Sequence, residues 1–262
     1  MPDRAARAWI AAAAPIVCAS LIFTSGVALA SPTQTLTLGA GFTPNELGAP
    51  TNLSTTMTFA SSAGLPDPVS DVVAYGPAGL SVQVRGVATC ERAKLEADGP
   101  SGCPAESRVG FGGGVGVFDL AGLPVKEPYT LDFFLAPQEH GHLAILIYVD
   151  AVNPVAVQFV LTAREVHGPR PYGFGLAVEV PPVSTVPGAG NASVESSFAS
   201  LGGANIAYYQ TIHGKRTLVH IKGLVAPATC PAGGFPFEVI VTFADGSTST
   251  ANYSSPCPSG RP

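Results

Sequence analysis

Alternating apolar and polar residues, in short runs that end at glycine, proline, asparagine or aspartate, occupy most of this 262-residue chain. From Tyr172 to Val180 every second residue is aromatic or aliphatic, and Leu80–Val84 repeats the pattern. A period of two places the apolar side chains on one face of a β-strand. Leu143–Val149 is apolar throughout, which is typical of a central strand covered on both faces. The pattern predicts an all-β fold of ten or more strands, an antiparallel β-sandwich built as one large or two packed lobes.

The composition excludes two other classes of protein. Glycine (30 residues) and proline (25 residues) are abundant, and charged residues make up only 12% of the chain. A protein of long helices is excluded, because helices tolerate glycine and proline poorly and need charged exposed faces. The formal net charge of −5 excludes a basic nucleic-acid-binding protein. One short helix is predicted at residues 90–97, just before the breaker Asp98-Gly99-Pro100.

Turn signals divide the chain further. The predicted units are a three-stranded meander over residues 129–161, a hairpin from 207–212 and 217–222, and a loop rich in proline and glycine over 181–192. Proline and glycine near residues 120–128 mark a boundary between an N-terminal β lobe (31–125) and a C-terminal β lobe (126–262).

The first thirty residues have the features of a secretory signal peptide. Arg4 and Arg7 precede an uncharged apolar stretch, and its end, Val27-Ala28-Leu29-Ala30, has the small-x-small pattern that signal peptidase accepts. Cleavage is predicted between Ala30 and Ser31. The alternative is an uncleaved membrane anchor, because the uncharged stretch is long enough to span a bilayer. No later stretch is long and apolar enough to do so.

Four cysteines follow the predicted cleavage site: Cys90, Cys103, Cys230 and Cys257. Four cysteines in an exported protein allow three disulfide pairings, and their order along the chain favours Cys90–Cys103 and Cys230–Cys257. The alternative is a zinc site with four cysteine ligands, which is weakly supported because the sequence has no C-x-x-C spacing.

A predicted hairpin supports the second pairing. Phe237–Phe243 and Thr248–Tyr253 have strand patterns, and the turn signal Ala244-Asp245-Gly246-Ser247 separates them. If Phe243 faces Thr248, the strands bring Cys230 and Cys257 close together at the base of the hairpin.

Several short motifs resemble a pattern found in exported actinobacterial proteins of unknown function. The motifs are Pro77-Ala78-Gly79-Leu80, Ala88-Thr89-Cys90, Leu95, Gly102-Cys103-Pro104, Ser107-Arg108-Val109-Gly110, Cys230-Pro231-Ala232-Gly233-Gly234-Phe235-Pro236-Phe237, Asp245-Gly246 and Cys257-Pro258. The resemblance implies an exported, disulfide-bonded β protein. It brings no catalytic residues with it.

His140-Gly141-His142, preceded by Glu139, lies in a predicted loop between two strands. An H-x-H pair on extended chain places both rings on one side and binds zinc or copper, and Glu139 or Asp150 would complete such a site. Histidine and glycine are also ordinary turn residues, and this interpretation is favoured. No cofactor is predicted, and His140 and His142 are the weak candidates for a metal site.

No catalytic residue is assigned. The sequence lacks the G-x-S-x-G and H-E-x-x-H motifs. Asp132, Asp150 and Glu179 lie on or beside predicted strands and are the first candidates for a glycosidase carboxylate pair, although solvated acids on strand faces are the favoured interpretation. The glycine-rich run Gly110–Gly116 predicts a strand or bulge, because no helix follows it as a phosphate loop requires.

Together, the signal peptide, the cysteines and the β pattern predict an exported, non-enzymatic binding or structural module, secreted or held in the cell envelope. Its partner is expected to be a cell-surface or envelope component and not nucleic acid, with no membrane span after signal removal. The alternative is a secreted hydrolase acting on envelope glycans or esters. A third hypothesis is a metal-binding protein built on His140 and His142.

Signal cleavage is directly testable. Protein secreted from an expressing host is expected to begin at Ser31 on N-terminal sequencing, because signal peptidase cuts after Ala30. Secreted protein that retains Met1 would contradict this prediction.

Overall fold

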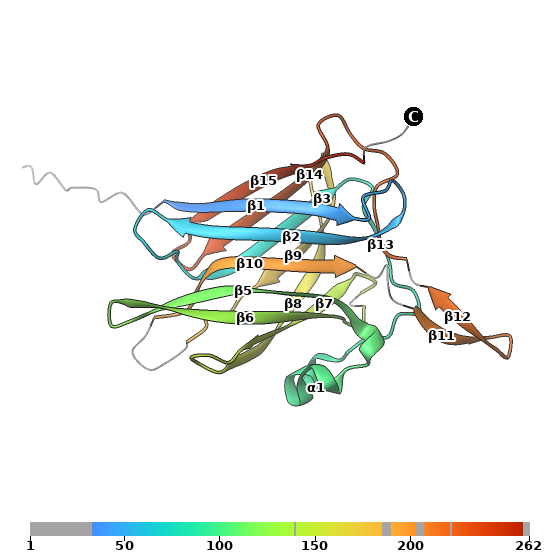
Figure 1. The fold of residues 1–262 in the computed structure, drawn as a ribbon, viewed down its shortest axis with the longest axis horizontal. Helices are drawn as coiled ribbons and strands as arrows, with labels where there is room; N and C mark the ends of the chain where they lie inside the picture. The colour runs from blue at the N-terminus through green and yellow to red at the C-terminus, as the bar shows by residue number, and fades with distance from the viewer. Residues whose placement is uncertain (1–32, 139, 185–189, 203–206, 221, 259–262) are drawn as a thin grey trace, which may run out of the picture. The chain divides into compact units, whose positions relative to one another are not determined.

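A computed structural model describes residues 33–138, 140–184, 190–202, 207–220 and 222–258, which belong to one compact unit (Figure 1). The predicted signal peptide (1–30), with its cleavage site at Ala30 and Ser31, lies outside the described residues.

Strands dominate the described residues. The strands of the main sheet are β1 (Gln34–Thr43), β2 (Pro50–Ser61), β3 (Val69–Pro77), β4 (Ser81–Gln83), β5 (Arg108–Leu120), β6 (Leu123–Leu135), β7 (Ala144–Ala151), β8 (Val157–His167), β9 (Tyr172–Glu179), β10 (Ser193–Gly202), β13 (Gly223–Val225), β14 (Phe235–Phe243) and β15 (Thr248–Ser255). A separate hairpin pairs β11 (Ala207–Ile212) with β12 (Lys215–His220). The helical elements are α1 (Arg92–Asp98) and the short 3₁₀ turns η1 (Gly99–Gly102) and η2 (Ala105–Ser107).

The main sheet has 13 strands in the described residues, in the order β15-β14-β3-β9-β8-β7-β6-β5-β10-β2-β13-β4, with β1 also paired to β2. The pairings along this path are antiparallel. The prediction of an all-β, antiparallel fold with one short helix is therefore confirmed. The two-layer packing of a sandwich stays a prediction, because hydrogen bonds join the strands into one continuous sheet.

This sheet curls so that its two ends meet. Strand β1 lies beside β15 although no ladder joins them (Figure 1). The Asn45 side-chain amide donates to the Pro256 carbonyl oxygen at 3.1 Å across this seam. Leu36 of β1, Val241 of β14 and Ala251 of β15 share one buried cluster. Burying one apolar face thus requires the sheet to fold back on itself.

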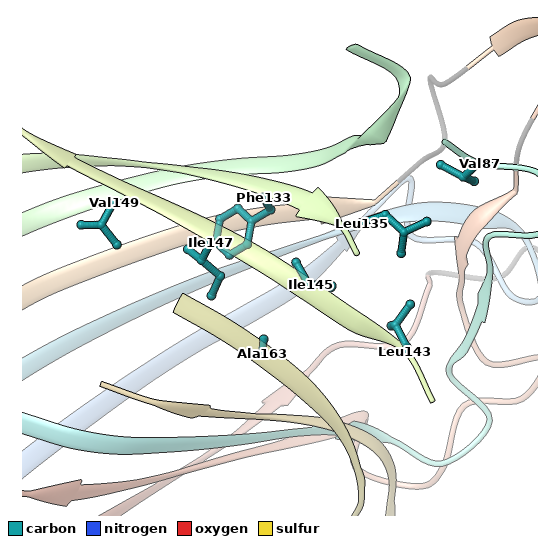
Figure 2. Packing of buried hydrophobic residues seen from close by; sticks show 8 residues of the cluster. All are labelled: Val87, Phe133, Leu135, Leu143, Ile145, Ile147, Val149 and Ala163. Carbon is teal, nitrogen blue, oxygen red and sulfur yellow. The ribbon is translucent and has the colours of Figure 1, made fainter. Parts of the chain in front are cut away.

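Strand β7 is the central strand that the apolar run predicted, and β6, β7 and β8 form the predicted meander. Ile145, Ile147 and Val149 of β7 belong to the cluster in Figure 2, with Phe133 and Leu135 of β6 and Ala163 of β8. The alternate residue Leu146 is also buried, in a second cluster on the other face. Both faces of β7 are therefore covered.

Helix α1 provides the cover on the outer face. Its Leu95 is fully buried and packs with Phe134, Leu146 and Val160. Arg92 bonds to Glu96 within the helix at 2.7 Å and donates to the Val160 carbonyl oxygen of β8 at 2.8 Å. The chain leading into and out of the helix is joined by the Cys90–Cys103 disulfide, with Cα atoms 5.2 Å apart. The disulfide thus fixes a short cap over the meander.

The second disulfide, Cys230–Cys257, closes the base of the β14–β15 hairpin, with Cα atoms 5.8 Å apart. The predicted register was wrong by one residue. Thr242 pairs with Thr248, and the Phe243 amide donates to the Ser247 carbonyl oxygen at 2.9 Å. The three-residue turn between Phe243 and Ser247 contains Gly246 at φ 82°, a conformation that glycine adopts at little cost.

The proposed lobe boundary near residue 125 falls inside the β5–β6 hairpin. Its strands pair from Arg108 with Phe134 to Leu120 with Leu123, with one register shift beside Val109. Residues 120–128 thus contain the turn of this hairpin and the first part of β6.

The disulfide at the hairpin base makes a stability prediction. Replacing Cys230 and Cys257 together with serine is expected to lower the free energy of unfolding by about 3.5 kcal/mol, because a closed loop of this length restricts the unfolded chain. Guanidinium denaturation of the variant and the parent measures the difference.

Intact mass provides the control for that experiment. Reduction is expected to add four hydrogens to the parent, which has two disulfides, and two to the variant. Equal denaturation midpoints for parent and variant would count against a stabilising role for this bond.

Candidate ligand cavity

The curled sheet encloses two neighbouring cavities. The larger, of about 280 Å³, is lined by inward-facing residues that include Phe59, Leu131, Val149, Phe159 and Val178. The smaller, of about 160 Å³, is lined by residues that include Leu38, Leu80, Val109, Phe174 and Phe237. Both linings are almost entirely apolar, and neither cavity is sealed from solvent.

The two cavities meet inside the sheet. Ala74 of β3, Ile145 of β7 and Leu176 of β9 line both of them. Along β7 and the residue before it, the inward residues run from Leu143 and Ile145 in the smaller cavity to Ile147, Val149 and Ala151 in the larger one. The space therefore extends along the strands.

Glycines on β5 keep part of this interior free of side chains. Gly110, Gly112, Gly114 and Gly116 alternate along the inward face, opposite Phe133, Leu131, Tyr129 and Glu127 of β6. A Cβ atom on Gly112 or Gly114 would overlap the carbonyl oxygen of Phe198 or Ser196 on the neighbouring strand β10. The run predicted as a glycine-rich strand is thus a strand, and a larger residue at these two positions would push β10 away.

The inner face is packed less completely than the outer face. Leu131, Phe159 and Leu176 point inward yet are only half-buried, whereas Leu146 and Val160 are buried beneath helix α1. Protein interiors normally fill such space to the density of organic crystals. The partly accessible leucine and phenylalanine side chains inside the sheet therefore indicate that they line a cavity and do not fill a closed core.

Glu127 is the acidic residue among the described residues of the lining, and the sequence patterns did not single it out. Only 6% of its surface is exposed. Its two carboxylate oxygens accept hydrogen bonds from the Asn153 and Val155 amides at 2.8 and 2.9 Å, in the turn between β7 and β8. The available signal was its position, because Glu127 stands in the apolar register between Val125 and Tyr129.

Tyr129 lies beside Glu127 on the inward face of β6. Its hydroxyl donates a hydrogen bond to the Ser196 carbonyl oxygen at 3.1 Å. Burial raises the pKa of Tyr129 to about 12, so the phenol is neutral at physiological pH. Its ring presents an apolar surface to the larger cavity.

The predicted histidine site does not come together. His140 and His142 are exposed, and His140 has a φ of 53°, as turn residues often do. Asp150 lies on β7 more than about 20 Å further along the extended chain, and Glu139 lies outside the described residues. In the described part of the chain, no group of three or more histidine, cysteine or acidic residues is placed to hold a metal ion.

The three candidate acids lie away from the cavities. Asp132 is paired with Arg108, and Asp150 accepts a hydrogen bond from Gln158 at 2.8 Å. Glu179 stands opposite Asp71 on the neighbouring strand. None of the three lines either cavity.

The cysteines are accounted for by disulfides. Cys90, Cys103, Cys230 and Cys257 form the two predicted pairs, which rules out the alternative zinc site. Disulfides are typical of an oxidising, extracellular compartment. No helix among the described residues has the length and apolar character needed to cross a membrane.

Comparison with protein-family models, with curated proteins and with solved structures finds no match to this chain.

A small polar cluster lies next to the larger cavity, where β1 begins and the β2–β3 loop meets the β14–β15 turn. The Gln34 amide donates to the Asp67 carboxylate at 2.6 Å. The pKa of Asp67 is raised, first by burial and then by the negative charge of Asp245 and a hydrogen bond with it, and the Gln34 bond opposes this shift. The pKa of Asp245 is lowered, chiefly by hydrogen bonds from Ser247.

Asp67→Asn is expected to raise the melting temperature at pH 7. A carboxyl whose pKa is raised on folding favours the folded state at low pH, and this contribution is lost as the pH rises through the folded pKa. Removing the charge therefore stabilises the protein at neutral pH, by no more than about 1 kcal/mol because the cluster is close to solvent.

The gain in melting temperature should vanish below pH 3.8, the pKa of this carboxyl in the unfolded chain. Melting curves from pH 3 to pH 8 measure it, and Glu46→Gln, an exposed carboxylate in the β1–β2 turn, serves as the control. A gain that is the same at every pH would refute the electrostatic explanation.

Proposed function

We propose that this protein is an exported, non-enzymatic binding protein that carries an apolar ligand inside its curled sheet. The observation that carries the proposal is the pair of adjoining cavities of about 160 and 280 Å³ with apolar linings. Ligand sites are typically concave and mostly apolar, with few polar groups. Glu127 and Ser193 are the buried polar residues at one end of this space.

The cavities leave space that an apolar ligand could fill. An engineered apolar cavity of about 150 Å³ stays dry and binds benzene, and the larger cavity here is almost twice that size. An apolar ligand would gain roughly 25 cal/mol for each Å² of its surface removed from water. It would also supply the packing that Leu131, Phe159 and Leu176 lack.

The proposed place of action is outside the cytoplasm, either free or associated with the cell envelope. The predicted signal peptide ending at Ala30 and the two disulfides support export. The partner would then be an apolar component of the envelope. An extracellular carrier serves such a component because its solubility in water is low.

The alternative is a secreted hydrolase of envelope glycans or esters. Such an enzyme needs two converging acids or a serine–histidine pair beside the bound substrate. Among the residues that the structure describes, the linings of the two cavities include one acid, Glu127, and no histidine. The binding proposal is therefore preferred, and substrate turnover is an outcome of its test.

Binding of an apolar fluorescent probe tests the proposal. Mature protein is expected to bind N-phenyl-1-naphthylamine in a saturable way and to increase its fluorescence. Ala199 lines the larger cavity from β10, so Ala199→Phe would fill space there and is expected to weaken binding about tenfold or more.

The matched control is Ala60→Phe, on an exposed position of β2. It should leave the affinity unchanged. Equal weakening by both variants, or an absence of saturable binding, would overturn the proposal. Conversion of an ester or glycan without accumulation of a bound complex would favour the hydrolase.

A further inference from the structure

We infer that the ligand is a lipid with one long acyl chain and an uncharged, hydroxyl-bearing head, with the chain lying along β7 and the head beside Glu127. This inference rests on the proposed function and names the class of ligand for the same site. Three features carry it: the length of the apolar space, the junction of its two parts and the difference between its two ends.

The space is long. Its wall along β7 runs from Leu143, the residue before the strand, to Ala151, which is about 26 Å of extended chain. The hydrocarbon core of a bilayer is about 30 Å thick and holds two layers of acyl chains, so one chain spans about 15 Å. A fully extended chain of sixteen to eighteen carbons is somewhat longer than this and fits along the wall.

The junction favours a flexible chain over a compact molecule. Ala74, Ile145 and Leu176 bound both cavities, and a compact ligand would occupy only one of them. A linear chain passes the junction and contacts both linings. Ala74 contributes only a small side chain on the β3 side, so a larger residue there would narrow the junction.

The two ends of the space differ in polarity. The outer end of the smaller cavity is lined by Val84, Val87, Val109 and Leu143. The outer end of the larger cavity contains Glu127 and Ser193, each with 6% of its surface exposed. Polar groups are buried only where they find hydrogen-bond partners, so the polar head belongs at this end.

Glu127 selects among polar heads. Its carboxylate already accepts two backbone hydrogen bonds and has acceptor capacity for a hydroxyl donor. A free fatty acid would bring a second carboxylate beside it, and like charges in a poorly solvated site repel strongly. An alcohol or a monoacylglycerol avoids this repulsion and supplies the donor.

An apolar path leads away from the same end. In the β5–β6 hairpin, Phe118 pairs with Val125 and Leu120 with Leu123, in the same inward register as Gly116 and Glu127. Leu120 is 44% exposed and Leu123 is 70% exposed. The inner face of the sheet thus continues past the cavity to an exposed apolar tip, a route by which a chain can enter with its tail first.

Displacement of bound N-phenyl-1-naphthylamine by a homologous series tests the chain. Monoacylglycerols from eight to eighteen carbons are expected to bind more tightly with length, by up to about fourfold per methylene, with a plateau near sixteen carbons. Affinity that does not depend on length would overturn the inference. If the probe itself does not bind, the proposed function fails and the inference fails with it.

A second arm tests the junction. Ala74→Leu is expected to weaken binding of the sixteen-carbon ligand at least tenfold while leaving the eight-carbon ligand within twofold. Ala60→Leu, on the exposed face of β2, should change neither. Equal losses for both chain lengths in Ala74→Leu would show that the two cavities do not hold one chain.

A third arm tests the head group. At pH 8, palmitic acid is expected to bind at least tenfold more weakly than monopalmitoylglycerol, and Glu127→Gln should reduce that ratio to within about threefold. The melting temperature of the variant shows whether the protein remains folded without the Glu127 carboxylate. A ratio that is unchanged in a folded Glu127→Gln protein would overturn the assignment of the head to this end.

Discussion

This structure depends on one constraint: the strands must pair into one long sheet, and the apolar face of that sheet must be buried. Each strand needs neighbours for its backbone groups, and its apolar face must leave water. Strand pairing meets the first need, and the sheet meets the second by curling until β1 lies beside β15, so that its inner face becomes an interior. The backbone path sets the size of that interior before any side chain fills it.

The interior is larger than its side chains can fill. Inward positions of β5 from Gly110 to Gly116 are glycines, and their neighbours on β10 include the small Ser197 and Ala199. The outer face shows the contrast, because helix α1 and the Cys90–Cys103 disulfide hold Leu95 against Phe134 and Leu146 in a closed cluster. The same meander is therefore tightly packed outside and loosely lined inside, which is the physical basis of the proposed ligand site.

Few polar groups line this interior, and two of them, Glu127 and Tyr129, have defined partners. Glu127 holds the β7–β8 turn through two backbone amides, and the Tyr129 hydroxyl bonds to Ser196. A ligand carried here would meet an apolar wall along most of its length and a hydrogen-bond acceptor at one end. The two disulfides and the predicted signal peptide support the proposed action outside the cell, where disulfides persist and apolar molecules need a protein to keep them in solution.

By itself, the sequence determined the strand class, the central position of Leu143–Val149, the short helix and both disulfide pairs. Alternation with a period of two and local turn chemistry act over a few residues, so they can be recognised along the chain. Only the tertiary structure decided the one-residue shift that sets Phe243 opposite Ser247, the remoteness of Asp150 from His142 and the inward placement of Glu127. The cavity belongs to this second group, because an enclosed volume depends on how far a whole sheet curls and on which residues from distant strands come to face one another.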